Sequence, residues 1–397
     1  MMLNRLLKPL MLLGLPVITS IVTAEAASDS KAQAWPFSGH SAWVYDTHNV
    51  PGEPRTVSPG FFSAEIARYN RNADPGHKIS TIYSYHGSME MYCSKHDPKH
   101  CPPDKLILSL ATESSAANHQ RSSVAHYRQT LGASDKLPEG VGSVAIIDGV
   151  VNGHYEGSLK GFNELSQEAA NAFAEKVAAA LCQDPNIEGV QFDLEPLDVR
   201  KKNGQYFFYK RIAALFAQDN GPCIDENHPQ GRYFSVFAPV HSLKANSQSA
   251  KNLQAIFSAH QNGYLIAPIY DLDATPLGHS TSVKRYRKLA QRQLDMLNRW
   301  SKQAEVPFKI GIPAAASVHE YVDCKGPPCK KKTPLPTSQL DYVQAVFTAM
   351  TETNIRDNPF FLGNAVWAWS RGISHGGASF HPQKPSDNMQ DLLGRQL

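Results

Sequence analysis

The segment Ile187–Pro196 combines an apolar strand pattern with acidic side chains at its end. Side chains alternate along a β-strand, so Gln191, Asp193 and Glu195 share one face and apolar residues share the other. Each polar group in that column would cost kilocalories if it were buried without a partner. In a barrel enzyme this polar column would face inward, and the acids would lie at the catalytic end of the strand. The negative charge of Asp193 would raise the pKa of Glu195 and keep it protonated. A protonated Glu195 is suited to proton donation. The plain alternative is an amphipathic strand whose polar face meets water.

Predicted strands alternate with predicted helices along most of the chain. The strands are expected at 41–47, 78–85, 141–148, 187–196, 233–239, 264–270, 308–313 and 364–370. The helices are expected at 61–72, 114–131, 166–182, 205–217, 250–260, 283–303 and 338–353. This alternation predicts a (β/α)8 TIM barrel in a single α/β domain, with 106–111 as a hairpin-like addition and 325–336 as a surface loop. An open doubly wound sheet is the alternative, but no strand is followed by the Gly-x-Gly-x-x-Gly turn of a dinucleotide site.

The composition is that of a globular protein, with 42% hydrophobic and 19% charged residues and a formal net charge of +3. This charge is too small to indicate nucleic-acid binding. Arg5 and Lys8 precede an apolar run that ends at the small residues of Ala24–Ala26, which predicts a signal peptide over residues 1–26. We therefore expect residues 27–397 to be a secreted or periplasmic barrel without a membrane anchor after cleavage.

Six cysteines follow the expected cleavage site, and an even number in an exported chain indicates disulfides. Short loops favour the pairs Cys93–Cys101 and Cys324–Cys329, which leaves Cys182–Cys223. A zinc site formed by Cys93, His96, His100 and Cys101 is the alternative to the first pair. The other histidines form no clear metal-binding constellation, and we expect neither a metal nor a cofactor.

Four segments, in chain order, resemble glycoside hydrolase family 18, the chitinase-like enzymes. Their residues are Glu188, Gln191, Asp193 and Glu195 at the acidic positions of the D-x-x-D-x-D-x-E motif, then Ala267–Asp271, Ile310–Pro313 and Gly363–Trp367. The last three are similar to the family's Met-x-Tyr-Asp, Gly-x-Pro and strand-eight tryptophan segments. Two departures are evident: Gln191 replaces an aspartate that can ionise, and Ala145–Gly149 replaces the usual Ser-x-Gly-Gly.

The resemblance implies substrate-assisted hydrolysis with retention of configuration. Glu195 would protonate the glycosidic oxygen while the substrate's own 2-acetamido oxygen attacks the sugar. Asp193 would hold the acetamido N–H, and Tyr270 would donate to the acetamido oxygen. The expected substrates are oligo- or polysaccharides with β-linked N-acetylglucosamine, such as chitin oligomers, peptidoglycan or an N-glycan core, hydrolysed by a monomeric enzyme.

Four further residues would bind the sugar: Gln191, Asp271, Trp367 and Trp369. The two tryptophans lie two positions apart, so they are expected to face the same way. Because Gln191 cannot ionise, its coupling to Asp193 should be weaker than in the family. Two other hypotheses stay open: a catalytically silent carbohydrate-binding barrel, and a two-carboxylate glycosidase that uses Asp271 as its second acid.

Overall fold

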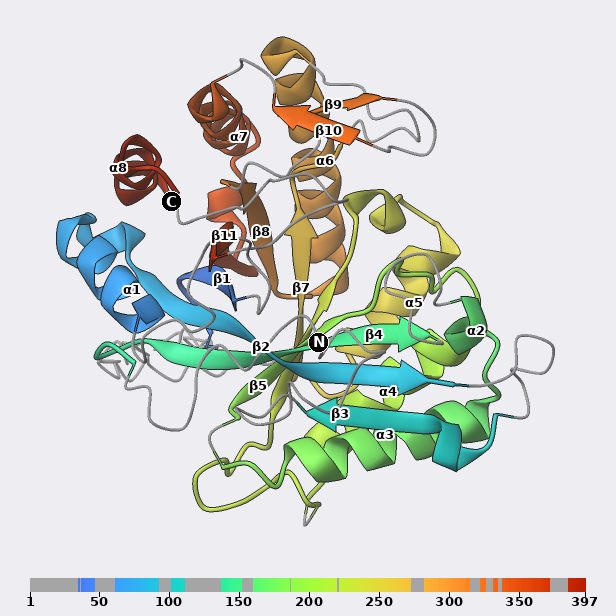
Figure 1. The fold of residues 1–397 in the computed structure, drawn as a ribbon. Coiled ribbons are helices and arrows are strands. Elements are labelled where there is room, and N and C mark those ends of the chain that lie inside the picture. Colours follow the sequence, from blue (N-terminus) through green and yellow to red (C-terminus); the bar gives the residue numbers. More distant parts are fainter. Residues whose placement is uncertain are drawn as a thin grey trace, which may run out of the picture. The chain divides into compact units, whose positions relative to one another are not determined.

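Eight parallel strands form a closed barrel in the computed structural model, within a unit that runs from Pro36 to Leu397 (Figure 1). The described residues are 35, 37–46, 61–92, 101–110, 137–151, 160–185, 187–219, 221–272, 282–314, 322–325, 331–334, 338–371 and 385–397. The barrel strands are β1 (His40–Asp46), β2 (Ile79–Met91), β4 (Gly142–Val151), β5 (Gly189–Asp193), β6 (Tyr233–Phe237), β7 (Gly263–Pro268), β8 (Phe308–Pro313) and β11 (Phe361–Arg371). They pair in that order, and β11 pairs with β1 to close the cylinder, which confirms the predicted TIM barrel.

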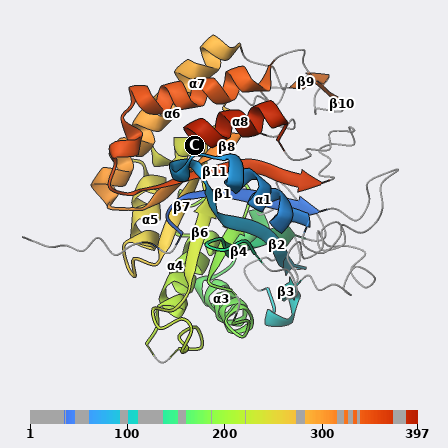
Figure 2. The ribbon, with the colours of Figure 1, turned by 90° about the vertical axis from the view of Figure 1, so that its left-hand side faces the viewer.

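Helices cover the outside of the barrel (Figures 1 and 2). They are α1 (Phe61–Asn72), α2 (Lys160–Asn163), α3 (Gln167–Leu181), α4 (Gly204–Phe216), α5 (Gln248–Phe257), α6 (Val283–Ala304), α7 (Gln339–Glu352) and α8 (Asp387–Gln396). Five helices begin where a side-chain oxygen accepts a backbone N–H of the first turn, and the capping residues are Ser166, Asn203, Ser247, Ser282 and Ser386. These caps satisfy donors that the helices leave open, which explains why the helices start there.

Strand β2 extends beyond the barrel. Its first half pairs with β1 and β4, whereas Gly87–Met91 pairs antiparallel with β3 (Leu106–Leu110) and parallel with β4. This confirms that 106–111 is a hairpin-like addition outside the eight barrel strands. The predicted end of β2 at residue 85 is wrong, because pairing with β3 and β4 extends the strand through glycine and polar residues that read as a loop.

Among the described elements, sequence analysis missed one hairpin and the short helices α2 and α8. The expected surface loop contains a hairpin of β9 (Val322–Lys325) and β10 (Lys331–Pro334). Near the carboxyl terminus, α8 packs beside α1 and α7 (Figure 1). Its buried residues include Met389 and Leu393, but a ten-residue amphipathic pattern is a weak signal by itself. The signal peptide and the helix predicted at 114–131 lie outside the described residues.

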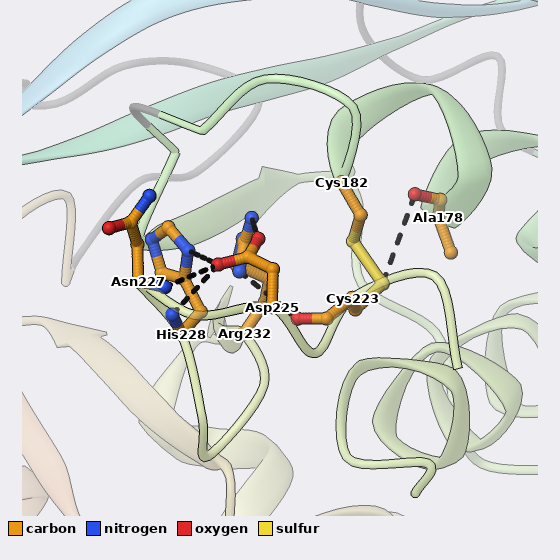
Figure 3. Close-up of polar contacts among 7 residues, drawn as sticks. All are labelled: Ala178, Cys182, Cys223, Asp225, Asn227, His228 and Arg232. Atoms are coloured by element: carbon orange, nitrogen blue, oxygen red, sulfur yellow. Dashed lines mark hydrogen bonds and ion pairs between the residues drawn. A yellow bond between two sulfur atoms is a disulfide. The ribbon is translucent and has the colours of Figure 1, made fainter. Parts of the chain in front are cut away.

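A disulfide joins Cys182, at the end of α3, to Cys223 in the loop before β6 (Figure 3). This confirms the third of the predicted pairs. Cys101 is also disulfide-bonded, which removes it as a thiolate ligand for zinc. The predicted pairing of Cys93 with Cys101 and of Cys324 with Cys329 involves residues outside the described part of the chain.

The same loop before β6 is held by an ion pair between a buried arginine and a half-exposed aspartate (Figure 3). Arg232 is fully buried and donates to Asp225 Oδ2 at 2.9 Å and to the Cys223 carbonyl at 3.0 Å. Asp225 Oδ1 accepts the backbone N–H groups of Asn227 and His228, both at 2.9 Å, and lies 2.9 Å from His228 Nδ1. The Arg232 guanidinium, followed by His228, holds the pKa of the Asp225 carboxyl well below its usual range.

A lysine is buried inside the barrel toward the amino ends of the strands. Lys309 Nζ donates to the Gly39 carbonyl at 3.0 Å and lies 5.8 Å from the centre of the Tyr83 ring. The hydroxyls of Tyr83 and Tyr264 lie 2.7 Å apart. Burial lowers the pKa of Lys309 to about 7 because the charged ammonium is poorly solvated there. Polar and aromatic side chains therefore fill this end of the barrel.

Candidate functional site

The face of β5 that carries the acids points into the barrel. Phe192 packs outward, with its ring centre 5.4 Å from that of Phe208 on α4. Gln191, one residue earlier, is 1% exposed and accepts a hydrogen bond from Trp43 Nε1 of β1 at 2.6 Å. Asp193 ends β5, Glu195 follows it, and both are partly buried. The predicted alternation along this strand is confirmed, and the alternative of a polar face in water is wrong for Gln191.

Four aromatic side chains form a connected group beside this strand, here named the aromatic cluster: Trp43, Phe237, Tyr270 and Trp367. Trp43 lies 5.7 Å from Trp367 and 6.4 Å from Phe237 between ring centres. Tyr270 stacks on Trp367 at 6.4 Å and lies 6.4 Å from Phe237. Aromatic faces of this kind bind the apolar faces of ring-shaped ligands, and Trp367 remains partly exposed.

Gly311 on β8 makes room for Tyr270. A Cβ atom at this glycine would lie 3.0 Å from Tyr270 Cε1 and 3.0 Å from Pro268 Cα, closer than side chains normally pack. Tyr270 is 8% exposed, whereas Asp271 directly after it is exposed and adopts a left-handed backbone with φ of 55°. The structure thus brings Tyr270 and Trp367 together and leaves Asp271 at the surface beside them.

Trp369 lies away from this cluster. It is fully buried, and its ring centre is 5.1 Å from that of Tyr69 on α1, between the barrel and its helical cover. Opposite Trp43, β11 contains one residue more than β1. This extra residue reverses the inward and outward alternation of the side chains that follow it on β11. The prediction that Trp367 and Trp369 face the same way is therefore wrong, because a register shift between strands cannot be read from a two-residue spacing.

Side chains of the next two helices fix the loop that carries Glu195. Gln205 of α4 is fully buried; its Nε2 donates to the Pro196 carbonyl and its Oε1 accepts the Asp198 N–H, both at 3.1 Å. Asn252 of α5 donates to the Val199 carbonyl at 2.7 Å. Sequence analysis missed both residues, because one polar residue in an amphipathic helix does not reveal which loop it contacts.

A third acid, Asp148 on β4, lies in register with Asp193 on the neighbouring strand β5. It is 3% exposed, and its Oδ1 accepts a hydrogen bond from Ser88 Oγ of β2. The Ser88 hydroxyl lies 2.7 Å from the Tyr85 hydroxyl. In the sequence, Asp148 stood out only as a departure from the small residues of the Ser-x-Gly-Gly segment.

Within the described ranges, no group of three or more His, Cys, Asp or Glu side chains is arranged to hold a metal ion. None of the helices described is long and apolar enough to cross a membrane. The carboxyl end of the barrel, here called the mouth, carries carboxyl groups beside aromatic rings. Such a set can donate a proton, accept hydrogen bonds from a polar ligand and stack against a ring.

No protein-family model matches the sequence, and no curated protein matches it significantly. Among solved structures, the chain is similar to a chitinase from Chromobacterium violaceum ATCC 12472, with 13% identity over 90% of this chain and 98% of that chain and a TM-score of 0.45. It is also similar to XacCel5A in complex with cellopentaose, with 12% identity over 90% and 99% and a TM-score of 0.44. An endoglucanase gives 12% identity over 92% and 99%, with a TM-score of 0.47. Similarities this low concern barrel architecture and carry no argument about substrate.

Proposed function

We propose that this protein is an exported, monomeric glycosidase that hydrolyses β-linked N-acetylglucosamine-containing glycans with retention of configuration. The observation that carries the proposal is the placement of Asp193 and Glu195. They stand partly buried at the carboxyl end of β5, on the strand whose inner residue Gln191 contacts the aromatic cluster through Trp43. Carboxyl groups at this end of a TIM barrel occupy the position from which barrel enzymes act.

In the proposed mechanism Glu195 donates its proton to the glycosidic oxygen as the bond from that oxygen to the anomeric carbon breaks. The acetamido oxygen of the same sugar bonds to the anomeric carbon and forms an oxazolinium ion. Asp193 accepts a hydrogen bond from the acetamido N–H and offsets the developing positive charge. Water then attacks the anomeric carbon and displaces the acetamido oxygen, while Glu195 takes a proton from the water, so that two inversions retain the configuration.

Two members of the aromatic cluster have separate tasks in this mechanism. Tyr270 donates its hydroxyl proton to the acetamido oxygen and orients it for attack. Trp367 stacks on the sugar ring, and its stacked contact with Tyr270 at 6.4 Å fixes the two side chains relative to each other. Positioning of the attacking group next to the reacting carbon supplies much of the rate gain in such intramolecular reactions.

The decisive experiment measures release from aryl N-acetylchitooligosaccharides by the wild-type protein and by Glu195→Gln. We expect the variant to lose about a thousandfold in kcat, because the amide has no proton to donate. The matched control is Glu226→Gln, the same chemical change at an exposed site before β6. Equal rates for wild type and Glu195→Gln, or no release by wild type from any 2-acetamido substrate, would reject the proposal.

The buried amide of Gln191 favours a second candidate, a carbohydrate-binding barrel without activity. Gln191 cannot ionise, and its oxygen is engaged by Trp43. This candidate predicts that N-acetylglucosamine oligomers bind, as measured by calorimetry, without product after long incubation. Turnover that depends on Glu195 excludes it. A glycosidase that used Asp271 as a second acid would instead keep its rate on substrates without the acetamido group.

A further inference from the structure

The residue before Asp193 on the inner face of β5 supplies no charge. Gln191 is 1% exposed, and Trp43 Nε1 donates to its Oε1 at 2.6 Å. That contact fixes the orientation of the amide, since Trp can act only as a donor there. On this side of Asp193, β5 therefore supplies no negative charge, and one can come only from a neighbouring strand.

Strand β4 places a carboxylate at that location. Four consecutive pairs join β4 to β5 in uninterrupted register, from Ala145 with Val190 to Asp148 with Asp193. Because neighbouring parallel strands are about 5 Å apart, paired side chains on one face lie side by side. Asp193 shares its face with Gln191, which points inward, so Asp148 and Asp193 are adjacent on the inner surface of the barrel.

A chain of hydroxyl groups ends on Asp148. Ser88 Oγ donates its only proton to Asp148 Oδ1, so the Tyr85 hydroxyl must donate to Ser88 across their 2.7 Å contact. Hydrogen bonds donated to a carboxylate favour its charged form, and donors in series strengthen each other. Ser88 and Tyr85 are both buried, so water does not compete for these bonds.

Other titratable groups also face Asp148. Among the described residues on the inner faces of the two flanking strands and at their carboxyl ends, they are Tyr85, Glu90, Asp193 and Glu195. Glu90 is 3% exposed, accepts a hydrogen bond from Tyr92 through Oε2, and has no hydrogen-bond partner at Oε1. Asp148 thus belongs to an acidic surface inside the barrel. Within that surface, Asp193 is the acid that pairs with it on the adjacent strand.

We propose that Asp148 is a positioning residue that acts through Asp193, supplying from β4 the negative charge that Gln191 does not provide on β5. The inference rests on the proposed glycosidase function. An ionised Asp148 disfavours a second negative charge nearby, which keeps a proton on the Asp193–Glu195 pair before the substrate reacts. As positive charge develops on the sugar, the same carboxylate adds to the field that stabilises it.

The test is the pH dependence of kcat/KM for Asp148→Asn on aryl N-acetylchitooligosaccharides. Removal of a negative charge lowers the pKa of the neighbouring acid, so the alkaline limb of the profile should move to lower pH by about one unit. The maximal kcat should fall about tenfold. Ser88→Ala should move the limb in the same direction by less, because Asp148 loses a donor but keeps its carboxyl group.

A double variant that moves the carboxylate from β4 to β5 makes the test more specific. Gln191→Asp added to Asp148→Asn returns the carboxylate to the neighbourhood of Asp193 from the other strand, and the alkaline limb should move back up. Glu226→Gln, far from the mouth, should leave both limbs in place. A purely structural role for Asp148 would change the amount of active protein and its melting temperature but not the positions of the limbs.

The outcomes separate this inference from the function on which it rests. If Glu195→Gln is inactive while folded Asp148→Asn and Ser88→Ala keep the wild-type limbs, only the role of Asp148 is overturned. If wild type shows no turnover that depends on Glu195, the proposed function and this inference both fail. If Asp148→Asn does not fold, Ser88→Ala decides the question, and unchanged limbs in that variant overturn the inference.

Discussion

Two carboxylates, one toward each end of this barrel, are held by hydrogen bonds, and their partners differ. Before β6, Asp225 accepts from the fully buried guanidinium of Arg232 and from two backbone N–H groups. At the mouth, Asp148 accepts from the Ser88 hydroxyl and lies in register with another acid, Asp193. A carboxylate paired with arginine stays charged until the pH is strongly acid, so near neutral pH it holds structure and has no proton to donate. Neighbouring carboxyl groups that lie beside like charges can share a proton, which is what acid catalysis requires.

The largest expected effect tests whether the region before β6 contributes to stability alone. Replacing Cys182 and Cys223 by alanine removes a cross-link between residues 41 positions apart. We expect the free energy of unfolding in urea to fall by about 4 kcal/mol, because the unfolded chain gains freedom. The kcat/KM on aryl N-acetylchitooligosaccharides should stay within about twofold of the wild-type value.

The control for that experiment repeats both measurements in a reductant, where the difference in stability between the wild type and the double variant should disappear, because the Cys182–Cys223 bond is then absent from both proteins. A large loss of kcat in a variant that is still folded would show that the two regions are coupled. The distinction between a region before β6 that only stabilises the fold and a region at the mouth that reacts would then be wrong.

A smaller effect is expected from the contact between α4 and the loop that carries Glu195. Gln205→Leu removes both hydrogen bonds to that loop at nearly constant volume. We expect kcat to fall about tenfold, because a displaced acid is misaligned for proton transfer. Steady-state kinetics should show the change mainly in kcat. Asn252→Leu, which releases the Val199 carbonyl farther along the loop, serves as the matched variant and should cost less. An equal or larger loss in Asn252→Leu would contradict this role for Gln205.

The smallest expected effect concerns acid unfolding. Because Arg232 and His228 depress the folded-state pKa of Asp225, its contribution to stability is present above the unfolded pKa of about 4 and is lost as pH falls further. Asp225→Asn should therefore be less stable than wild type at pH 7, and the two urea midpoints should converge below about pH 4. Curves that stay parallel down to pH 2 would contradict this assignment.

A second titration acts on both proteins in that experiment. Burial, and next the charge of Lys309, lower the pKa of His40 from 6.5 to about 3. The unfolded chain then binds a proton that the folded protein does not, so stability should decline from about pH 6.5 toward pH 3. Since this loss is common to wild type and Asp225→Asn, only the difference between their curves reports on Asp225.

The fold and the inward direction of β5 could be predicted because both follow from local periodicity. Alternation along a single strand placed Gln191 against the barrel interior, and strand–helix alternation gave the barrel itself. Relations between strands could not be predicted in the same way. The side on which Trp369 lies depends on a register shift against β1, and the importance of Asp148 depends on which residue of β5 it meets. The contacts of Gln205 likewise depend on how α4 docks.

The link between Cys182 and Cys223 has a consequence for the order in which the barrel opens. One cysteine precedes β5 and the other precedes β6, and these two strands are neighbours. Their amino ends are thus tied covalently, in addition to the hydrogen bonds that pair the two strands. We expect the backbone amides of β5 and β6 to be among the last to exchange with deuterium. The strand that carries the acids should therefore stay folded when other parts of the barrel open.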